Sequence, residues 1–250
     1  MTLQIFDSYS EISCAIAQEI SQQLRQKPDS LFCLAAGETS LGIFDALIDR
    51  FHHKQIDFSS AFFIAMDEWM GMSPATSGSC GDFLNRHFLN KVNFMPGRVR
   101  LIDGTVTDSN TECASVRAFI EARGGIDFLL LGIGMNGHLA LNEPGVDFGL
   151  SVHTTELDSV TKMVGKKYFQ TPNPKLTGGI TIGMHEIRSA KRVILSVSGI
   201  RKQEILRRVV NQPVSNSVPA TILNELPQAD IYCDRDAAGD FADCEANSSF

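Results

Sequence analysis

One run of the chain constrains the fold more than any other. The apolar segment Ile126–Leu131 passes directly into the glycine-rich sequence Gly132-Ile-Gly-Met-Asn-Gly-His-Leu-Ala-Leu-Asn-Glu-Pro-Gly145. A short apolar run that ends in glycines is typical of a buried strand, and the glycines let the backbone turn sharply and approach a ligand. In open α/β folds, ligands bind beyond the carboxyl ends of the strands. The run therefore predicts a binding site at a sheet edge, and the alternative is a structural turn without a function.

Apolar strand-like runs alternate with segments of helical period along most of the chain. The expected strands cover Leu31–Ala36, Ala61–Met66, Arg98–Ile102, Ile126–Gly132, Ile180–Ile182, Arg192–Val197 and Ala229–Cys233. The expected helices cover Thr39–Phe51, Asp82–Leu89, Glu112–Ala122 and Lys202–Val210. This alternation predicts an α/β fold, with a doubly wound, mostly parallel sheet and helices on both faces. We expect a single domain over residues 1–233 and an acidic, flexible tail over residues 234–250.

Composition limits the classes of partner. The 250 residues carry a net charge of −7, which argues against broad binding to nucleic acid or to anionic membranes. The sequence shows no apolar stretch long enough to cross a bilayer, and its polar start does not resemble a signal peptide. The six cysteines include no CxxC pair, so neither a zinc site nor a redox motif is suggested. We expect a cytoplasmic protein, and the sequence leaves its oligomeric state open, a homo-oligomer included.

Two sites of chemistry are expected after the first two of these strands. Ala35-Ala-Gly-Glu-Thr-Ser40 joins a strand to a helix, where free N–H groups and the helix dipole favour an anion such as phosphate. The alternative is that Thr39 or Ser40 caps the helix. Met66-Asp-Glu-Trp69 places two carboxylates beside an aromatic ring, as a general base in a partly apolar cleft would require. The alternative is an acidic exit from the strand.

The glycine-rich run and two basic clusters complete the candidate site. Histidine side chains change charge close to physiological pH, so His138 could transfer protons during the opening of a sugar ring, with Glu143 orienting it. Lysines 162, 166 and 167 form one basic cluster, and Arg201 with Lys202 forms the other. In an acidic chain, two separated clusters suggest a clamp for phosphate, with one contact from each. The alternative is that these residues lie on solvated helix faces.

Together these motifs closely resemble the glucosamine-6-phosphate deaminase/isomerase family. The resemblance rests on Met66-Asp-Glu-Trp69 and on Gly134-Met-Asn-Gly-His-Leu-Ala-Leu-Asn-Glu-Pro144. It continues through Gly179-Ile-Thr-Ile-Gly183 and Val218-Pro-Ala-Thr-Ile-Leu223, so it spans the chain from about Leu31 to Cys233. It implies that a 2-amino-2-deoxyhexose 6-phosphate is isomerised and loses ammonia, giving a ketohexose 6-phosphate, with no metal or organic cofactor.

The resemblance also implies roles for individual residues. His138 matches the residue that opens the sugar ring, Asp67 matches the base that moves a proton between C2 and C1, and Glu143 matches the carboxylate paired with the histidine. For the substrate phosphate, the matching positions are Gly37 and Thr39 in the phosphate loop, Lys202 as the phosphate-binding lysine, and Lys167 in place of a family arginine.

The chain departs from the family pattern at two places. Asn136 stands where many glucosamine-6-phosphate deaminases have aspartate, so it cannot supply a negative charge to His138. The segment Ser77-Gly-Ser-Cys-Gly-Asp-Phe83 replaces a tyrosine-bearing lid pattern. Both changes resemble the galactosamine-6-phosphate branch, which favours a galactosamine substrate, with glucosamine 6-phosphate next. Two alternatives stay open: a 6-phosphogluconolactonase-like hydrolase, which Glu143 argues against, and a regulator that binds sugar phosphate without turnover, supported only by Asn136.

Overall fold

A computed structural model describes residues 1–169 and 176–239. Its central sheet has seven strands, and every neighbouring pair is parallel. The strand order is β1 (Thr2–Phe6), β10 (Ala229–Asp234), β9 (Val193–Val197), β6 (Phe128–Leu131), β2 (Leu31–Leu34), β3 (Phe62–Ile64) and β5 (Val99–Arg100). A second, antiparallel sheet has the order β4 (Asp67–Trp69), β8 (Gly178–Thr181) and β7 (His153–Glu156).

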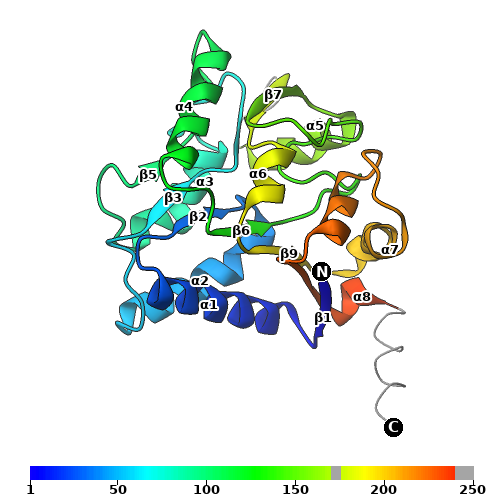
Figure 1. Ribbon diagram of the computed structural model, residues 1–250, viewed down its shortest axis with the longest axis horizontal. Coiled ribbons are helices and arrows are strands. Elements are labelled where there is room, and N and C mark those ends of the chain that lie inside the picture. Colours follow the sequence, from blue (N-terminus) through cyan, green and yellow to red (C-terminus); the bar gives the residue numbers. More distant parts are fainter. Residues whose placement is uncertain (170–175, 240–250) are drawn as a thin grey trace.

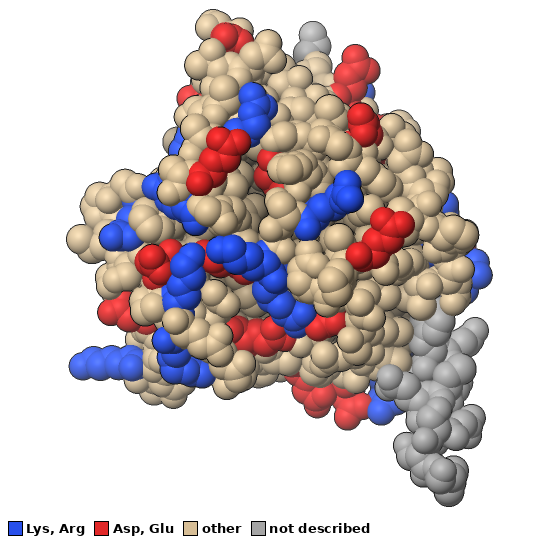
Figure 2. Space-filling view, in the orientation of Figure 1, with Lys and Arg blue, Asp and Glu red and all other residues tan. Residues whose placement is uncertain are grey.

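Helices cover both faces of the central sheet. In Figure 1, α1 (Tyr9–Gln26) and α2 (Leu41–His52) lie below it, whereas α4 (Ser109–Glu121) and α6 (Met184–Ser189) lie above. The remaining helices are α3 (Cys80–His87), α5 (Ser159–Gly165), α7 (Gln203–Asn211) and α8 (Arg235–Ala238), and short 3₁₀ turns cover Glu38–Ser40, Leu89–Lys91, Lys166–Tyr168, Ile200–Lys202 and Pro219–Glu225. The described residues contain no helix with the length and apolarity needed to span a bilayer. Figure 2 shows acidic and basic side chains interspersed over the face of the molecule that is turned to the viewer in Figure 1.

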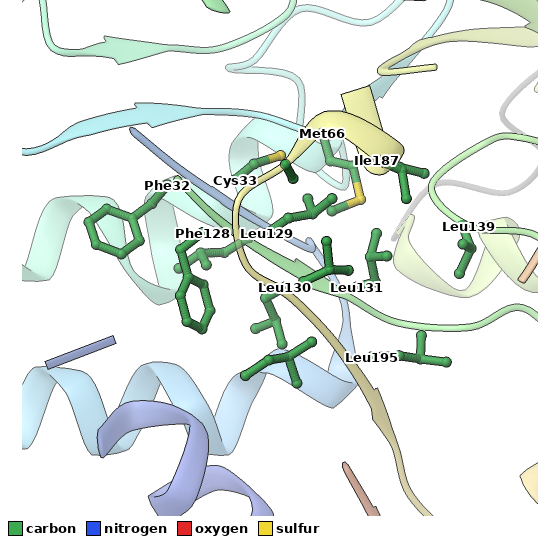
Figure 3. Packing of buried hydrophobic residues seen from close by; sticks show 14 of the residues in the cluster. Phe32, Cys33, Met66, Phe128, Leu129, Leu130, Leu131, Leu139, Ile187 and Leu195 are labelled. Carbon is green, nitrogen blue, oxygen red and sulfur yellow. The ribbon is translucent and has the colours of Figure 1, made fainter. Parts of the chain in front are cut away.

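The core explains why the central strands read as continuous apolar runs. All four residues of β2 and all four of β6 are buried, because helices cover both faces of a parallel sheet. Figure 3 shows Phe32 of β2 beside Phe128 of β6, and their ring centroids lie 6.1 Å apart. The same register pairs Leu34 with Leu130, so the two strands end at one level and their following loops start side by side.

The predicted α/β fold is confirmed, and the expected strands and helices occur with shifted ends. The expected strand at Ile180–Ile182 corresponds to β8, which belongs to the antiparallel sheet rather than to the central one. Sequence reasoning did not identify β1, α1, β4, β7, α5 or α6 as separate elements. The expected tail also begins later than residue 234, because α8 packs Ala237 and Ala238 into the core. Residues 240–250 lie outside the described residues.

Asp127 ties the amino ends of the two central strands together. Its side chain is only 2% exposed and accepts hydrogen bonds from the backbone N–H of Leu31 at 2.8 Å and from Lys27 and Lys191 at 2.6 and 2.7 Å. Burial alone would raise the pKa of this carboxyl group, but the two lysines and the N–H group hold it below its usual value. The pair of strands that supports the site is therefore anchored by one buried anion.

Replacing Asp127 with alanine should lower the free energy of unfolding by about 3 kcal/mol, because it leaves a buried N–H group and two lysines without their acceptor. Chemical denaturation at neutral pH measures this loss. The control is Asp49→Ala, since Asp49 is 71% exposed and its loss should cost little. Equal losses in the two variants would contradict an anchoring role for Asp127.

Candidate active site

A cavity of about 760 Å³ opens where the carboxyl ends of the central strands meet the antiparallel sheet. Its walls come from the loops after β2, β6 and β9, from β4, and from α5. After β2 the chain continues to β3, on one side of the β2–β6 pair. After β6 it returns to the central sheet at β9, on the other side of that pair, so the loops after β2 and β6 diverge at the edge of the sheet. This switch of direction is where ligands bind in open α/β sheets.

Asp67 lies on the cavity wall, at the first position of β4. Burial raises the pKa of its carboxyl group to about 6, and a hydrogen bond from the Cys80 thiol and the charge of His138 only partly oppose this. A carboxylate is a stronger base when its environment raises its pKa toward the working pH. Asp67 is therefore ionised at neutral pH and a stronger base than an ordinary aspartate.

Glu68 has a structural task, although the sequence places it beside Asp67. It is 1% exposed and accepts hydrogen bonds from the backbone N–H groups of Trp69, Cys80 and Gly81 at 2.9, 3.0 and 2.9 Å. Burial raises its pKa to about 7, against the effect of these donors and with a contribution from the charge of Asp67. Glu68 thus binds the N-terminus of α3 and does not line the cavity.

His138 lines the cavity and is held from behind. Its Nδ1 atom lies 3.3 Å from the Glu143 carboxylate and 3.1 Å from the Thr161 hydroxyl. Asn136 donates to the same Glu143 oxygen at 2.8 Å and accepts the backbone N–H of His138 at 3.2 Å. When Nδ1 carries the proton and donates to the carboxylate, Nε2 is left as the basic atom of the ring.

Glu143 stays ionised throughout the neutral range. Its side chain is 10% exposed, and burial alone would raise its pKa, but hydrogen bonds from His138, Thr161 and Asn136 and the charge of His138 lower the pKa to about 2. A second oxygen accepts the backbone N–H of Asp158 at 3.3 Å. The carboxylate is therefore available to stabilise a positive charge on the imidazole ring.

Two glycines of the loop after β6 are required by close contacts. A Cβ atom on Gly134 would lie 2.5 Å from the ring of His138. Gly137 has φ +87°, and a Cβ atom there would lie 2.6 Å from the side chain of Val218. The glycine-rich sequence therefore lets the imidazole pack flat on its own backbone.

The loop after β2 is suited to an anion. The N–H groups of Gly37, Glu38 and Thr39 donate no hydrogen bond within the described residues. Ser40 does not cap α2, since its hydroxyl donates to the carbonyl of Ala35 at 2.7 Å and the helix has no side-chain cap. Tyr9 braces the loop, because its hydroxyl lies 3.0 Å from the carbonyl of Thr39 and accepts the N–H of Gly42 at 2.7 Å. Unpaired N–H groups at a helix start are typical of phosphate sites.

Three cations face the same cavity: Lys167, Arg201 and Lys202. Lys202 is anchored by a hydrogen bond of 2.6 Å to the carbonyl of Ile133, and its pKa is lowered by burial and by the charges of Lys167 and Arg201. Lys167 forms an ion pair of 3.0 Å with Glu38, in the loop after β2. The effect of Lys167 and Arg201 on the pKa of Lys202 shows that the three cations repel one another, which predicts that a multiply charged anion binds among them.

The structure brings most of the sequence-derived candidates to one place. Asp67, His138, Gly37, Thr39, Lys167 and Lys202 all line the cavity. Asn136 and Glu143 lie behind His138 rather than on the wall, and Lys162 and Lys166 are not part of the lining. Sequence reasoning missed Thr161 and Tyr9, since neither lies in a motif and each acts from a helix that it did not identify. The described residues contain no group of three or more His, Cys, Asp or Glu side chains arranged to hold a metal ion.

Comparison with known proteins agrees with this arrangement. Residues 7–231 match the model of the family described as glucosamine-6-phosphate isomerases/6-phosphogluconolactonase. The chain belongs to this family. The glucosamine-6-phosphate deaminase of Thermoanaerobacter pseudethanolicus is 33% identical over 238 residues, which cover 95% of this chain and 94% of the relative. The predicted family is thus confirmed.

Solved structures give the same result. A monomeric glucosamine-6-phosphate deaminase superposes with a TM-score of 0.92 at 29% identity, covering 95% of this chain and 99% of the other. A 6-phosphogluconolactonase from Thermotoga maritima superposes with a TM-score of 0.72 at 16% identity, covering 93% of this chain and 98% of the other. The second likeness is one of fold alone.

The variant Asp67→Asn should be more stable than the wild type at alkaline pH. The folded-state pKa of about 6 exceeds the ordinary value of 3.8, so the ionised carboxylate destabilises the fold above pH 6. The difference amounts to at most about 3 kcal/mol. It should shrink as the pH falls from 6 toward 4, where the folded protein binds the proton.

Thermal unfolding from pH 4 to 9 measures this effect as the difference in Tm between variant and wild type. The control is Asp49→Asn at an exposed position, where little difference is expected. A Tm for Asp67→Asn that lies at or below that of the wild type across the alkaline range would contradict a buried, destabilised base.

Proposed function

We propose that this protein converts galactosamine 6-phosphate, and less efficiently glucosamine 6-phosphate, into a ketohexose 6-phosphate and ammonia. Its family and its glucosamine-6-phosphate deaminase relatives make it an enzyme of the amino-sugar-6-phosphate deaminase/isomerase class. One observation carries the proposal: a raised-pKa carboxylate, a histidine and three cations share one cavity. Its cytoplasmic location stays a prediction, and its oligomeric state stays open.

The phosphate binds at the end of the cavity formed by the loop after β2 and by the cations. The free N–H groups of Gly37 and Thr39 donate to its oxygens, and Lys202 and Lys167 neutralise its charge. Lys167 then exchanges the Glu38 carboxylate for the phosphate. Binding energy from the phosphate, which lies far from the reacting carbons, is used to orient the sugar.

His138 opens the pyranose ring. Its Nε2 atom accepts the proton of the anomeric hydroxyl and a proton is returned to the ring oxygen as the C1–O5 bond breaks, which leaves an open-chain aldehyde. The imidazolium formed on the way is stabilised by Glu143, whose low pKa keeps it anionic. Asn136 holds the Glu143 oxygen in place through its amide group.

Asp67 carries out the isomerisation. Its carboxylate removes the proton from C2 while the C1 carbonyl oxygen takes a proton from solvent, giving an enolamine, and the protonated Asp67 then delivers its proton to C1. General base catalysis of this kind contributes roughly 10²–10⁴-fold. The product carries a protonated imine at C2, to which water adds; a proton returns to solvent, and the C–N bond then breaks to release ammonia and form the ketone.

The preference for galactosamine rests on two sequence features. Asn136-Gly137-His138 and the Cys80-containing segment 77–83 resemble the galactosamine-6-phosphate branch. Cys80 and Trp69 both line the cavity close to Asp67, so the second feature lies within reach of the sugar. A smaller side chain than tyrosine at this wall leaves room for a hydroxyl of different orientation.

Ammonia release from galactosamine 6-phosphate and glucosamine 6-phosphate, measured side by side with purified protein, tests the function. We expect release from both sugars and a higher kcat/KM for the galactosamine compound. A higher kcat/KM for the glucosamine compound would refute the preference and leave the reaction standing. Absence of release, together with stabilisation by both sugars, would instead support a binding protein, and hydrolysis of 6-phosphogluconolactone would support the hydrolase.

The variant Asp67→Asn is the matched control for this assay. It should lose turnover by at least about 10²-fold, because an amide cannot accept the C2 proton. The variant should still be stabilised by the substrate, since phosphate contacts are untouched. A near wild-type rate would show that Asp67 is not the base.

Replacement of Lys202 with alanine should mainly raise KM, because the lysine binds the phosphate in the ground state and in the transition state alike. A rise of about 10-fold corresponds to one charge-assisted contact of about 1.4 kcal/mol. Lys162→Ala is the control, since Lys162 belongs to the basic segment but does not line the cavity. A loss confined to kcat, or an equal effect of both substitutions, would contradict the phosphate role.

A further inference from the structure

The imidazole ring of His138 has two partners at its Nδ1 atom, and the closer one belongs to a separate helix. The hydroxyl of Thr161, in α5, lies 3.1 Å from Nδ1, whereas the carboxylate of Glu143 lies 3.3 Å away. Hydrogen bonds between N–H groups and oxygen usually measure about 2.7–3.2 Å. The contact to the hydroxyl falls within this range and the contact to the carboxylate lies just beyond it. Thr161 is therefore the closer partner of this edge of the ring.

The hydrogen bonds of the ring all act on Nδ1. Within residues 1–169 and 176–239, no hydrogen bond reaches the Nε2 atom of His138, and one face of the ring packs on the backbone of Gly134. A neutral imidazole carries one proton, and its hydrogen bonds decide which nitrogen holds it. An ionised carboxylate can only accept a hydrogen bond, and a hydroxyl can accept one as well. Both partners can therefore keep the proton on Nδ1 and leave Nε2 as the basic atom.

The start of α5 is fixed against the same carboxylate. Asp158 caps the helix by accepting the backbone N–H of Val160 at 2.7 Å, and its own backbone N–H donates to Glu143 at 3.3 Å. Thr161 is the third residue of this helix and is only 5% exposed. The helix start, the carboxylate and the imidazole ring thus form one buried, hydrogen-bonded cluster at the wall of the cavity.

We propose that Thr161 is a positioning residue for His138: its hydroxyl holds the ring with the proton on Nδ1 and with Nε2 free to accept the proton of the anomeric hydroxyl. This inference rests on the proposed function. Without the hydroxyl, the ring would depend on the longer contact to Glu143 alone. It would then spend more time rotated, or in the tautomer whose Nε2 already carries a proton and cannot act as a base.

Two variants at this position separate the hydrogen bond from packing. Thr161→Val keeps the shape of the side chain and removes the hydroxyl, so kcat/KM for both amino-sugar phosphates should fall roughly 3- to 10-fold, as for the loss of one neutral hydrogen bond. The affinity for inorganic phosphate should not change, because the groups proposed to bind phosphate keep their places. Thr161→Ser restores the hydroxyl and should recover most of the loss. A serine variant as impaired as the valine variant would overturn the proposal.

Thr111→Val is the matched control. Thr111 is the third residue of α4, as Thr161 is of α5, and both helices are capped by an aspartate. Its hydroxyl donates to the capping Asp108 at 2.6 Å, and α4 contributes no residue to the wall of the cavity. This substitution should lower Tm slightly and leave kcat/KM unchanged. An equal loss of kcat/KM in Thr111→Val and Thr161→Val would show a general effect on helix starts and would overturn the proposal.

Nitrogen NMR of the ligand-free protein separates this inference from the proposed function. The shifts of Nδ1 and Nε2 report which of them carries the proton of the neutral ring, and the variant His138→Asn assigns the two signals. In the wild type, Thr161→Ser and Thr111→Val, the shifts should identify Nδ1 as the protonated atom. In Thr161→Val the two shifts should move toward each other, as the second tautomer becomes populated.

Each outcome of this measurement has one meaning. Shifts in Thr161→Val that equal those of the wild type would refute the role of Thr161 whatever the kinetics. Altered shifts in a protein that releases ammonia from neither sugar phosphate would refute only the proposed function, because the contact between the hydroxyl and the ring would then still hold.

Discussion

The pairing of β2 with β6 is the constraint on which the site depends. The two strands end level with each other, and the chain continues in different directions from their ends. In the loop after β2, the N–H groups of residues 37–39 donate to no other part of the described chain, and the loop after β6 carries His138. Because both loops start from buried strands, neither can shift without disturbing the core. The proposed phosphate subsite and the proposed proton-transfer group are thereby held at a fixed separation.

The small antiparallel sheet completes the site from the other side. It presents Asp67 on β4, and β8 lies between β4 and β7 as its central strand. Thr181 of β8 accepts the backbone N–H of Leu141 at 3.2 Å, which ties this sheet to the loop that carries His138. Asp67 and His138 are therefore joined through one short strand, although they lie 71 positions apart in the chain. Both groups keep their relative positions because β4, β8 and the loop form one hydrogen-bonded unit.

Charged groups in the candidate site lower the stability of the ligand-free fold. Burial raises the pKa of the Asp67 carboxyl group, and burial together with the charges of Lys167 and Arg201 lowers the pKa of Lys202, so these two ionised groups disfavour the folded state without ligand. The fold tolerates this because the central strands are fully buried and because charges remote from the cavity, such as Asp127, are paired. In the proposed function, binding of a phosphate dianion would relieve the repulsion around Lys202, so the electrostatic cost in the ligand-free protein would favour phosphate as the ligand.

The sequence predicts the parts of this structure that rest on local pattern. Continuous apolar runs identify β2 and β6, since burial on both faces leaves no polar position. The edge strand β1 is half exposed, and α1 buries a stripe of Ile12, Ile16 and Ile20 among many polar residues, so both give weak signals. The short strands β4 and β7 consist largely of polar residues, and their pairing with β8 depends on contacts distant in sequence. Local pattern does not encode such contacts.

The candidate site was predictable to the same extent. Motif residues that line the cavity could be named from the sequence, because the glycines, the histidine and the carboxylates stand close together in the chain. The different tasks of Asp67 and Glu68 could not be separated from the sequence. Glu68 accepts N–H groups from the start of α3, including that of Gly81 thirteen residues later in the chain, and local pattern does not reveal this contact. Likewise Thr161 reaches His138 from α5, and nothing in its sequence surroundings marks it.

Asn136 and Glu143 divide between them the hydrogen bonds and the negative charge around His138. Asn136 contributes hydrogen bonds to Glu143 and to the backbone of His138, but no charge. Glu143 then supplies the charge opposite Nδ1, and its pKa of about 2 keeps it ionised wherever the imidazole titrates. The amide donor itself helps to lower that pKa, so the loss of one negative charge strengthens the remaining one. A histidine can thus retain a charged partner although the motif has lost its aspartate, which argues against reading Asn136 as a sign of a decayed site.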